Sequence, residues 1–118
     1  MNLIKKIKCQ FKRCIEPNDI NKNQLEELVK QGCILIDVRS KQEFEEGHLD
    51  NAICIPEYEI KKEIINIVND KNKKIVLYCD TGSRSKKAEK ILQKIGYKNV
   101  YNLYKGQFGE EWKTKSPF

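Results

Sequence analysis

The chain has 118 residues, of which 34% are charged and 39% hydrophobic, and a formal net charge of +6. This length suits one small domain with a single core and is too short for two. No apolar run approaches the roughly 18 residues that a membrane-spanning helix requires. Five basic residues and no acidic ones lie in residues 1–15, which leaves only +1 for the rest. A nucleic-acid-binding face spread over the fold is therefore not expected.

The cysteines are predicted to be free thiols. Their number is odd, and the start, MNLIKKIKCQFKRC, lacks the apolar block of a secretory signal, so we expect a cytoplasmic protein without a disulfide framework. The chain has no C-x-x-C pair, and His48 is its single histidine, so neither a structural metal nor a bound cofactor is expected. The cysteines are Cys9, Cys14, Cys33, Cys54 and Cys79.

We divide the chain into a basic amphipathic N-terminal extension, residues 1–16, and one domain, residues 17–118. Apolar residues at spacings of three and four predict a short helix in the extension. We favour packing of this apolar stripe on the domain; the alternative is weak docking of residues 1–15 on an anionic membrane surface or a partner. The stripe consists of Leu3, Ile4, Ile7, Phe11 and Ile15.

The domain is predicted to open with a helix and a strand. Pro17 ends the N-terminal pattern, and a short helix then starts at Leu25 and ends at Gly32, a suitable C-cap. The apolar run CILIDV, residues 33–38, has the length of a buried strand.

A second helix, a short strand and a third helix are expected next. Ser40 and Glu43 fit a capping box, in which each side chain accepts a hydrogen bond from a free backbone N–H at a helix start. AICIP, residues 52–56, is a predicted strand that a proline ends. Apolar residues at helical spacing over 60–68 predict the helix that follows.

The last predicted elements are two strands around a helix. KIVLYC, residues 74–79, is a strand, the loop DTGSR follows, and residues 88–95 show the apolar spacing of a helix. NVYNL, residues 99–103, is the fourth predicted strand. Apolar strands that alternate with helices indicate an α/β fold, with a parallel sheet covered on both faces.

The loop after the third predicted strand carries the candidate nucleophile. Cys79 ends this strand, and ligands of parallel sheets bind beyond the carboxyl ends of the strands. Gly82 permits a tight turn with positive φ, which lets successive backbone N–H groups face an anion. The helix N-terminus and Arg84 favour the thiolate form of Cys79.

The alternative interpretation of Cys79 is a structural thiol, because free cysteines are among the most often buried residues. We favour the nucleophile. His48 lies in the loop EEGHLDNA, which we interpret as structural, so no partner base is assigned. A thiolate stabilised by backbone dipoles needs no base, which favours sulfur or phosphorus transfer over a cysteine protease.

Three stretches together resemble the rhodanese domain family. LIDVRSKQEFEEGHLDNAICIP, residues 35–56, is similar to the family's first signature, and YCDTGSRS, residues 78–85, is similar to its active-site loop. With NVYNLYKG, residues 99–106, the resemblance spans roughly residues 17–113. An ordered set of motifs is more specific than any one of them.

The resemblance implies a small three-layer fold with a central parallel sheet flanked by helices, and a sulfurtransferase of the thiosulfate sulfurtransferase type. Cys79 would accept a sulfane sulfur from thiosulfate or another persulfide donor, and a thiol or cyanide would take it from the resulting persulfide. A protein can replace either small molecule, and no nucleic acid is implied.

Carried over by position, the resemblance makes Cys79 the nucleophile and Arg84 the arginine that steadies the loop and its anion. Asp37 and Arg39 match the first signature, and we interpret them as a structural pair. The substrate-binding cradle would consist of Asp80, Thr81, Gly82, Ser83, Arg84 and Ser85.

Two other functions are compatible with this pattern. One is a non-catalytic binding module of the same fold, and the less favoured one is a cysteine-dependent phosphatase or arsenate reductase. Phosphatases that resemble this fold have one more residue between cysteine and arginine than the four between Cys79 and Arg84. A shorter cradle should suit a sulfur atom better than a phosphoryl group.

The sequence departs from the rhodanese pattern at two places. Asp80 stands where the family often has a basic residue, so its charge should oppose anion binding and make thiosulfate a poor donor. YKGQFGEEW, residues 104–112, lacks the paired glycine of the family. We interpret Trp112 and Phe118 as packing residues.

Overall fold

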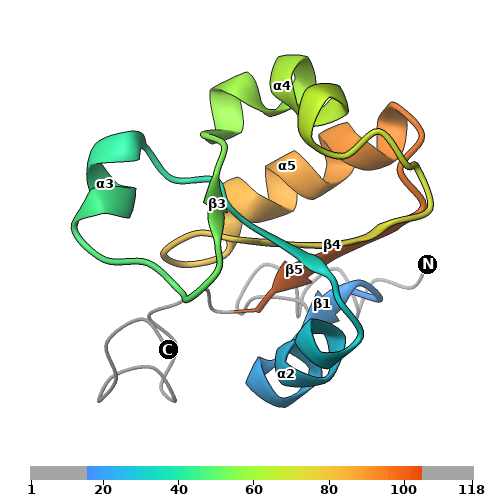
Figure 1. The fold of residues 1–118 in the computed structure, drawn as a ribbon, viewed down its shortest axis with the longest axis horizontal. Coiled ribbons are helices and arrows are strands. Elements are labelled where there is room, and N and C mark those ends of the chain that lie inside the picture. The colour runs from blue at the N-terminus through green and yellow to red at the C-terminus, as the bar shows by residue number, and fades with distance from the viewer. Residues whose placement is uncertain (1–15, 105–118) are drawn as a thin grey trace, which may run out of the picture.

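The computed structural model of the chain describes residues 16–104, which form a parallel five-stranded sheet with helices on its faces (Figure 1). The strand order is β1-β5-β4-β2-β3, so β4 lies at the centre between β5 and β2. The continuous apolar character of β4 fits this place, because a sheet covered on both faces buries its central strands. The strands are β1 (Asp19–Ile20), β2 (Ile34–Asp37), β3 (Ile53–Cys54), β4 (Lys74–Tyr78) and β5 (Asn99–Leu103).

Side-chain caps define where two of the helices begin. Asn21 and Gln24 form a capping box at the start of α2, with both hydrogen bonds at 2.8 Å. Ser40 and Glu43 form the predicted capping box at the start of α3. The helices are α2 (Lys22–Lys30), α3 (Lys41–Glu45), the 3-10 turn η1 (Glu57–Glu59), α4 (Ile60–Ile67) and α5 (Ser83–Lys94).

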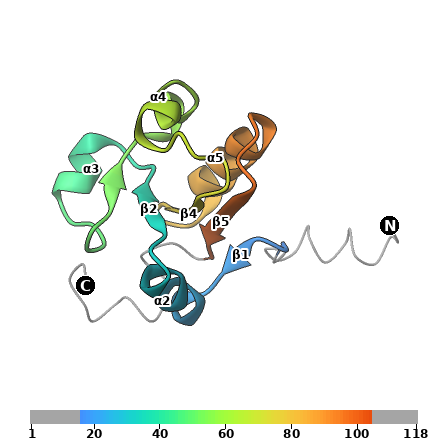
Figure 2. The ribbon, with the colours of Figure 1, turned by 45° about the vertical axis from the view of Figure 1, so that its right-hand side comes forward.

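The sheet separates two apolar cores. Figure 2 shows α4 and α5 on one face of the sheet and α2 on the other. On the first face, Ile64 of α4 and Leu92 of α5 pack with Leu77 of β4. On the second face, Leu25 of α2 packs with Tyr78 at the end of the same strand. The central strand β4 therefore contributes to both cores, which fixes the position of the loop that follows it.

The predicted fold class is confirmed, and the four predicted strands are present. The fifth strand, β1, was not predicted, because its two residues lie where Pro17 and its neighbours indicate a break. Cys79 follows the last residue of β4 instead of ending the strand. Ser83 and Arg84, predicted as loop, belong to the first turn of α5.

Several predictions concern residues outside 16–104. They are the apolar stripe of residues 1–15, the role of that segment at a membrane surface or partner, and the packing of Trp112 and Phe118. Within the described residues, no helix has the length and apolar character needed to span a membrane.

Candidate active site

Cys79 lies at the carboxyl end of the central strand, and the chain after it turns directly into α5. Gly82 makes this turn with a φ of +94°, a conformation that residues with a side chain rarely adopt. The turn brings the N-terminus of a 12-residue helix to Cys79. Residue 79 is only 1% exposed, so the protein encloses the sulfur.

The Cys79 sulfur accepts hydrogen bonds from the backbone of the loop and helix. The N–H of Gly82 donates to Sγ at 3.0 Å, and the N–H of Ser85 donates at 3.4 Å. The first N–H groups of a helix have no partner within the helix and carry the positive end of its dipole. Sγ therefore takes the place of a side-chain cap for α5, in a position where negative charge is favoured.

A chain of polar side chains continues from Cys79 to the edge strand β1. Ser85 Oγ lies 3.4 Å from Cys79 Sγ and donates a hydrogen bond to Asn102 Oδ1. Asn102 Nδ2 donates to Asp19 Oδ1 at 3.1 Å, because the pairing of β1 with β5 sets these residues side by side. Lys86 completes the chain, with Nζ 2.6 Å from Asp19 Oδ1.

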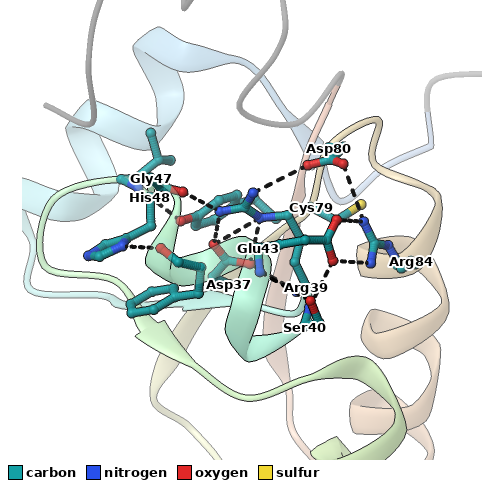
Figure 3. A network of polar contacts seen from close by, with 12 residues as sticks. Asp37, Arg39, Ser40, Glu43, Gly47, His48, Cys79, Asp80 and Arg84 are labelled. Atoms are coloured by element: carbon teal, nitrogen blue, oxygen red, sulfur yellow. Dashed lines mark hydrogen bonds and ion pairs between the residues drawn. The ribbon is translucent and has the colours of Figure 1, made fainter.

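Arg84 is held by carboxylates from two other segments (Figure 3). Its Nη1 and Nη2 lie 2.9 and 3.1 Å from the two carboxylate oxygens of Glu43 on α3, a bidentate arrangement. Asp80 Oδ2 lies 3.4 Å from Nη2. The hydrogen bonds from Arg84 lower the pKa of Glu43 to about 2, and those to Glu43 raise the pKa of Arg84.

Arg39 and Asp37 form a buried ion pair at the end of β2, as Figure 3 shows. Arg39 Nη2 lies 2.8 Å from Asp37 Oδ2 and donates to the Gly47 carbonyl at 2.5 Å. Arg39 Nη1 lies 3.5 Å from Asp80 Oδ1, so this guanidinium connects the ends of β2 and β4. Asp37 and Arg39 thus pair with one another, and their role as structural support stays a prediction.

Asp80 lies between Arg39 and Arg84, but its partial burial disfavours the charged form of the carboxyl group. Its burial outweighs the attraction of Arg39 and raises the pKa of its carboxyl group. Among residues 16–104, its Oδ1 is a buried oxygen that accepts no hydrogen bond. The Asp80 charge is therefore only partly compensated where it adjoins Cys79.

The other residues named from the sequence lie around this centre. Thr81 and Ser83 are exposed, with their hydroxyl oxygens 3.2 Å apart. His48 stacks on Phe44 at 3.6 Å between ring centroids, and its Nδ1 lies 2.7 Å from the Phe44 carbonyl oxygen. In the described part of the chain, no cluster of His, Cys, Asp and Glu side chains is arranged to hold a metal ion.

A family model described as the Rhodanese-like domain matches residues 21–114, which include every residue of this centre except Asp19. The chain belongs to the rhodanese-like domain family. Within the rhodanese-like fold, the loop of Cys79 to Ser85 and the Asp37–Arg39 pair occupy adjacent strand ends, β4 and β2. The roles of these residues in substrate binding remain predictions.

Relatives of the rhodanese-like chain carry two different names. Thiosulfate sulfurtransferase PspE of Escherichia coli is 40% identical over 67 residues, which cover 57% of this chain and 64% of that protein. The tRNA uridine(34) hydroxylase of Sodalis glossinidius is 39% identical over 77 residues, 62% of this chain but 22% of that protein. The chain thus spans less than two thirds of the length of either relative.

A solved structure supports the same fold. The rhodanese with anions from E. coli shares 35% identity with this chain at a TM-score of 0.61, over 65% of this chain and 91% of that one. The rhodanese-like architecture is therefore shown by both sequence and structure.

Four polar residues of the centre were missed from the sequence. Glu43 was interpreted only as a helix cap, although it also binds Arg84. Asn102, Asp19 and Lys86 were not singled out at all. An asparagine inside the otherwise apolar strand NVYNL was the available signal, because a buried polar side chain requires a partner.

Proposed function

We propose that this rhodanese-like chain is a sulfurtransferase that carries a sulfane sulfur as a persulfide on Cys79. The observation that supports the proposal is the contact of Cys79 Sγ with the N–H groups of Gly82 and Ser85 at the start of α5. Backbone donors at a helix N-terminus stabilise a sulfur anion, whether thiolate or persulfide. The similarity to a protein named thiosulfate sulfurtransferase supports the same chemistry.

The proposed reaction has two displacements at sulfur. The Cys79 thiolate attacks the outer sulfur of thiosulfate, the sulfur–sulfur bond of thiosulfate breaks, and sulfite leaves with its electron pair. A thiolate or cyanide then attacks the terminal sulfur of the persulfide, and Cys79 leaves as the thiolate. Each nucleophile and each leaving group is an anion, so neither step needs a side chain as base or acid.

The environment of Arg84 favours sulfur transfer over phosphoryl transfer. A phosphoryl group carries its charge on oxygens that an arginine must bind in the transition state. Both terminal nitrogens of Arg84 already face Glu43, and Asp80 adjoins one of them. A guanidinium so neutralised suits a substrate that delivers one sulfur atom better than a phosphate dianion.

The charge of Asp80 also affects which sulfur donor is preferred. Thiosulfate is a dianion, and Asp80 places a carboxylate directly after the nucleophile. We therefore propose the persulfide of a small thiol or of a protein cysteine as the preferred donor, with thiosulfate as a weaker one.

Intact-mass measurement of the full chain tests the proposal. After exposure to thiosulfate, and separately to a small-molecule persulfide, the wild type should gain one sulfur atom and Cys79→Ser should gain none. Cys54→Ser is the matched control, since burial raises the pKa of the Cys54 thiol, and it should gain sulfur like the wild type. A gain that persists in Cys79→Ser would place the chemistry elsewhere, and no gain with either donor would favour a non-catalytic binding module.

A further inference from the structure

The direction of the hydrogen bonds that join Ser85, Asn102 and Asp19 follows from the charge of Asp19. Although burial opposes it, hydrogen bonds from the Glu16 backbone, Lys86 and Asn102 lower the pKa of Asp19. Lys86 lies 2.6 Å from the same carboxylate, so Asp19 is ionised and can only accept hydrogen bonds.

Because Asp19 can only accept, it determines the orientation of the Asn102 side-chain amide. The amide must direct its NH₂ group to Asp19, which leaves its carbonyl oxygen, also an acceptor only, facing Ser85. Ser85 has a single hydroxyl proton and gives it to Asn102 Oδ1. Only lone pairs of the Ser85 oxygen then remain to face Cys79 Sγ, 3.4 Å away.

We propose that Asn102, oriented by Asp19 and Lys86, is a positioning residue that keeps the Ser85 hydroxyl from donating to Cys79. In this arrangement the Ser85 oxygen accepts the S–H of the thiol and contributes no donor to the thiolate. The hydrogen bonds to the thiolate then come from the backbone N–H groups of Gly82 and Ser85, and none comes from the Ser85 hydroxyl. Asn102 thereby shifts the balance at Cys79 toward the thiol.

This inference rests on the proposed role of Cys79 as a nucleophile but can be tested without a sulfur donor. Several charged groups lie on the elements around the sulfur. Replacing Asn102 or Ser85 by an apolar residue leaves all of these charges in place, so a change can be assigned to hydrogen bonding. The groups are Asp80 in the loop, Arg84 and Lys86 on α5, Glu43 on α3, Asp37 at the end of β2, Arg39 after it, and Asp19 on β1.

The experiment is a pH titration of thiolate absorbance in the full chain, taken as the difference between each protein and its Cys79→Ser counterpart. Asn102→Leu releases the Ser85 hydroxyl to donate to the thiolate, so the midpoint should fall by about one pH unit. Ser85→Ala removes an acceptor from the thiol and no donor from the thiolate, so its midpoint should also fall. In the Ser85→Ala background, Asn102→Leu should cause no further shift.

Asn99→Leu is the matched control, because Asn99 lies on the same strand and hydrogen-bonds the Asn72 carbonyl, far from the network. It should leave the midpoint unchanged. A higher midpoint in Ser85→Ala would show that the hydroxyl donates to the thiolate and would overturn the proposal. The proposal would also be overturned if Asn102→Leu still shifted the midpoint in the Ser85→Ala background. Ser85→Ala is a small change, so the direction of its midpoint shift can be measured even if Asn102→Leu does not fold.

The two proposals fail independently. If the titration behaves as expected and no persulfide forms, Asn102 still positions Ser85 and the sulfurtransferase proposal alone is wrong. Alkylation of the tryptic peptide 75–84, whose single cysteine is Cys79, provides a second readout. Below the wild-type midpoint, Asn102→Leu should react about tenfold faster, as a one-unit shift requires.

Discussion

Cys79 combines two properties that the sequence presents as alternatives. It is buried, with 1% of the residue exposed, and its sulfur is the acceptor of two backbone N–H groups at a helix start. In the proposed sulfur transfer, a donor molecule has to displace neighbouring atoms to reach the sulfur. We therefore expect Asp80, whose charge is only partly compensated, to influence the choice of donor.

Replacing Asp80 by a neutral residue should improve the use of thiosulfate. Asp80→Asn removes a like charge beside the anion, and the KM for thiosulfate should fall roughly two- to fivefold, the range for one partly exposed charge. Asp80→Arg should act in the same direction and more strongly. Steady-state kinetics at fixed pH measure the change, which should shrink as salt is added.

Asp70→Asn is the control for this prediction. Asp70 is an exposed carboxylate that precedes β4, at the opposite end of the strand from Cys79. It should leave the KM unchanged. An unchanged or higher KM in Asp80→Asn would contradict the electrostatic explanation of donor preference.

Helix α3 links the site to the neighbouring strand through one residue. Glu43 caps its own helix by accepting from the Ser40 N–H at 3.0 Å, and the same carboxylate binds Arg84 on α5. The two helices follow adjacent strands, β2 and β4, so their N-terminal turns meet at one edge of the sheet. Glu43 therefore joins the local structure of one helix to the position of another.

Glu43→Gln should weaken this link while keeping the cap, because glutamine also serves in a capping box. Both partners are about a third exposed, at 38% for Arg84 and 32% for Glu43, and solvent screens the pair. The free energy of unfolding should fall by about 0.2–1 kcal/mol at neutral pH. Urea unfolding of both proteins at several pH values measures the difference.

The pH dependence of this difference has a defined sign. Hydrogen bonds from Arg84 lower the pKa of Glu43 from 4.5 to about 2, so its contribution to stability is complete above pH 4.5 and is lost as pH falls toward 2. Wild type and Glu43→Gln should converge near pH 2. A gap that is constant from pH 7 to pH 2 would show that the carboxylate charge is not its cause.

Local signals predicted these elements better than they predicted the contacts between them. The Ser40–Glu43 capping box is contained in four consecutive residues, so the sequence alone indicates it. The bond from Glu43 to Arg84 joins residues 41 apart and depends on the order of the strands, which periodicity does not supply. Arg84 could be named as the partner of Glu43 only once β2 and β4 were known to be neighbours in the sheet.

At the scale of the whole molecule, the two faces of the sheet are covered unequally. In the described residues, α4 and α5 cover one face, and α2 covers the other with Leu25 fully buried. The smaller core packs against Val76 and Tyr78 of β4, the strand that leads to Cys79. Its packing therefore supports the strand that positions the sulfur.

Leu25→Ala should destabilise the protein by about 2–5 kcal/mol, the cost of removing a buried leucine and leaving a cavity. Val29→Ala on the same helix is the control. Val29 is 40% exposed, so its replacement should change the free energy of unfolding by less than about 0.5 kcal/mol. Urea denaturation measures both, and equal effects would show that α2 is not anchored through Leu25.

The parallel sheet was predictable because its four longer apolar segments alternate with helical patterns. The fifth strand was not, because β1 has two residues beside Pro17, where the sequence indicates a break, whereas the equally short β3 lies within the apolar run AICIP. The same short strand contributes Asp19 to the network behind Cys79. The failure to predict β1 therefore also explains why Asp19 was missed.

The pairing of β1 with β5 also has a consequence for how the molecule assembles. The hydrogen bond between Asp19 and Asn102 joins residues 83 apart, and contacts of such separation form slowly because a long loop must close first. During synthesis Cys79 and Ser85 emerge before Asn102 exists. The Ser85 hydroxyl therefore acquires its partner only after β5 has been synthesised and has joined the sheet.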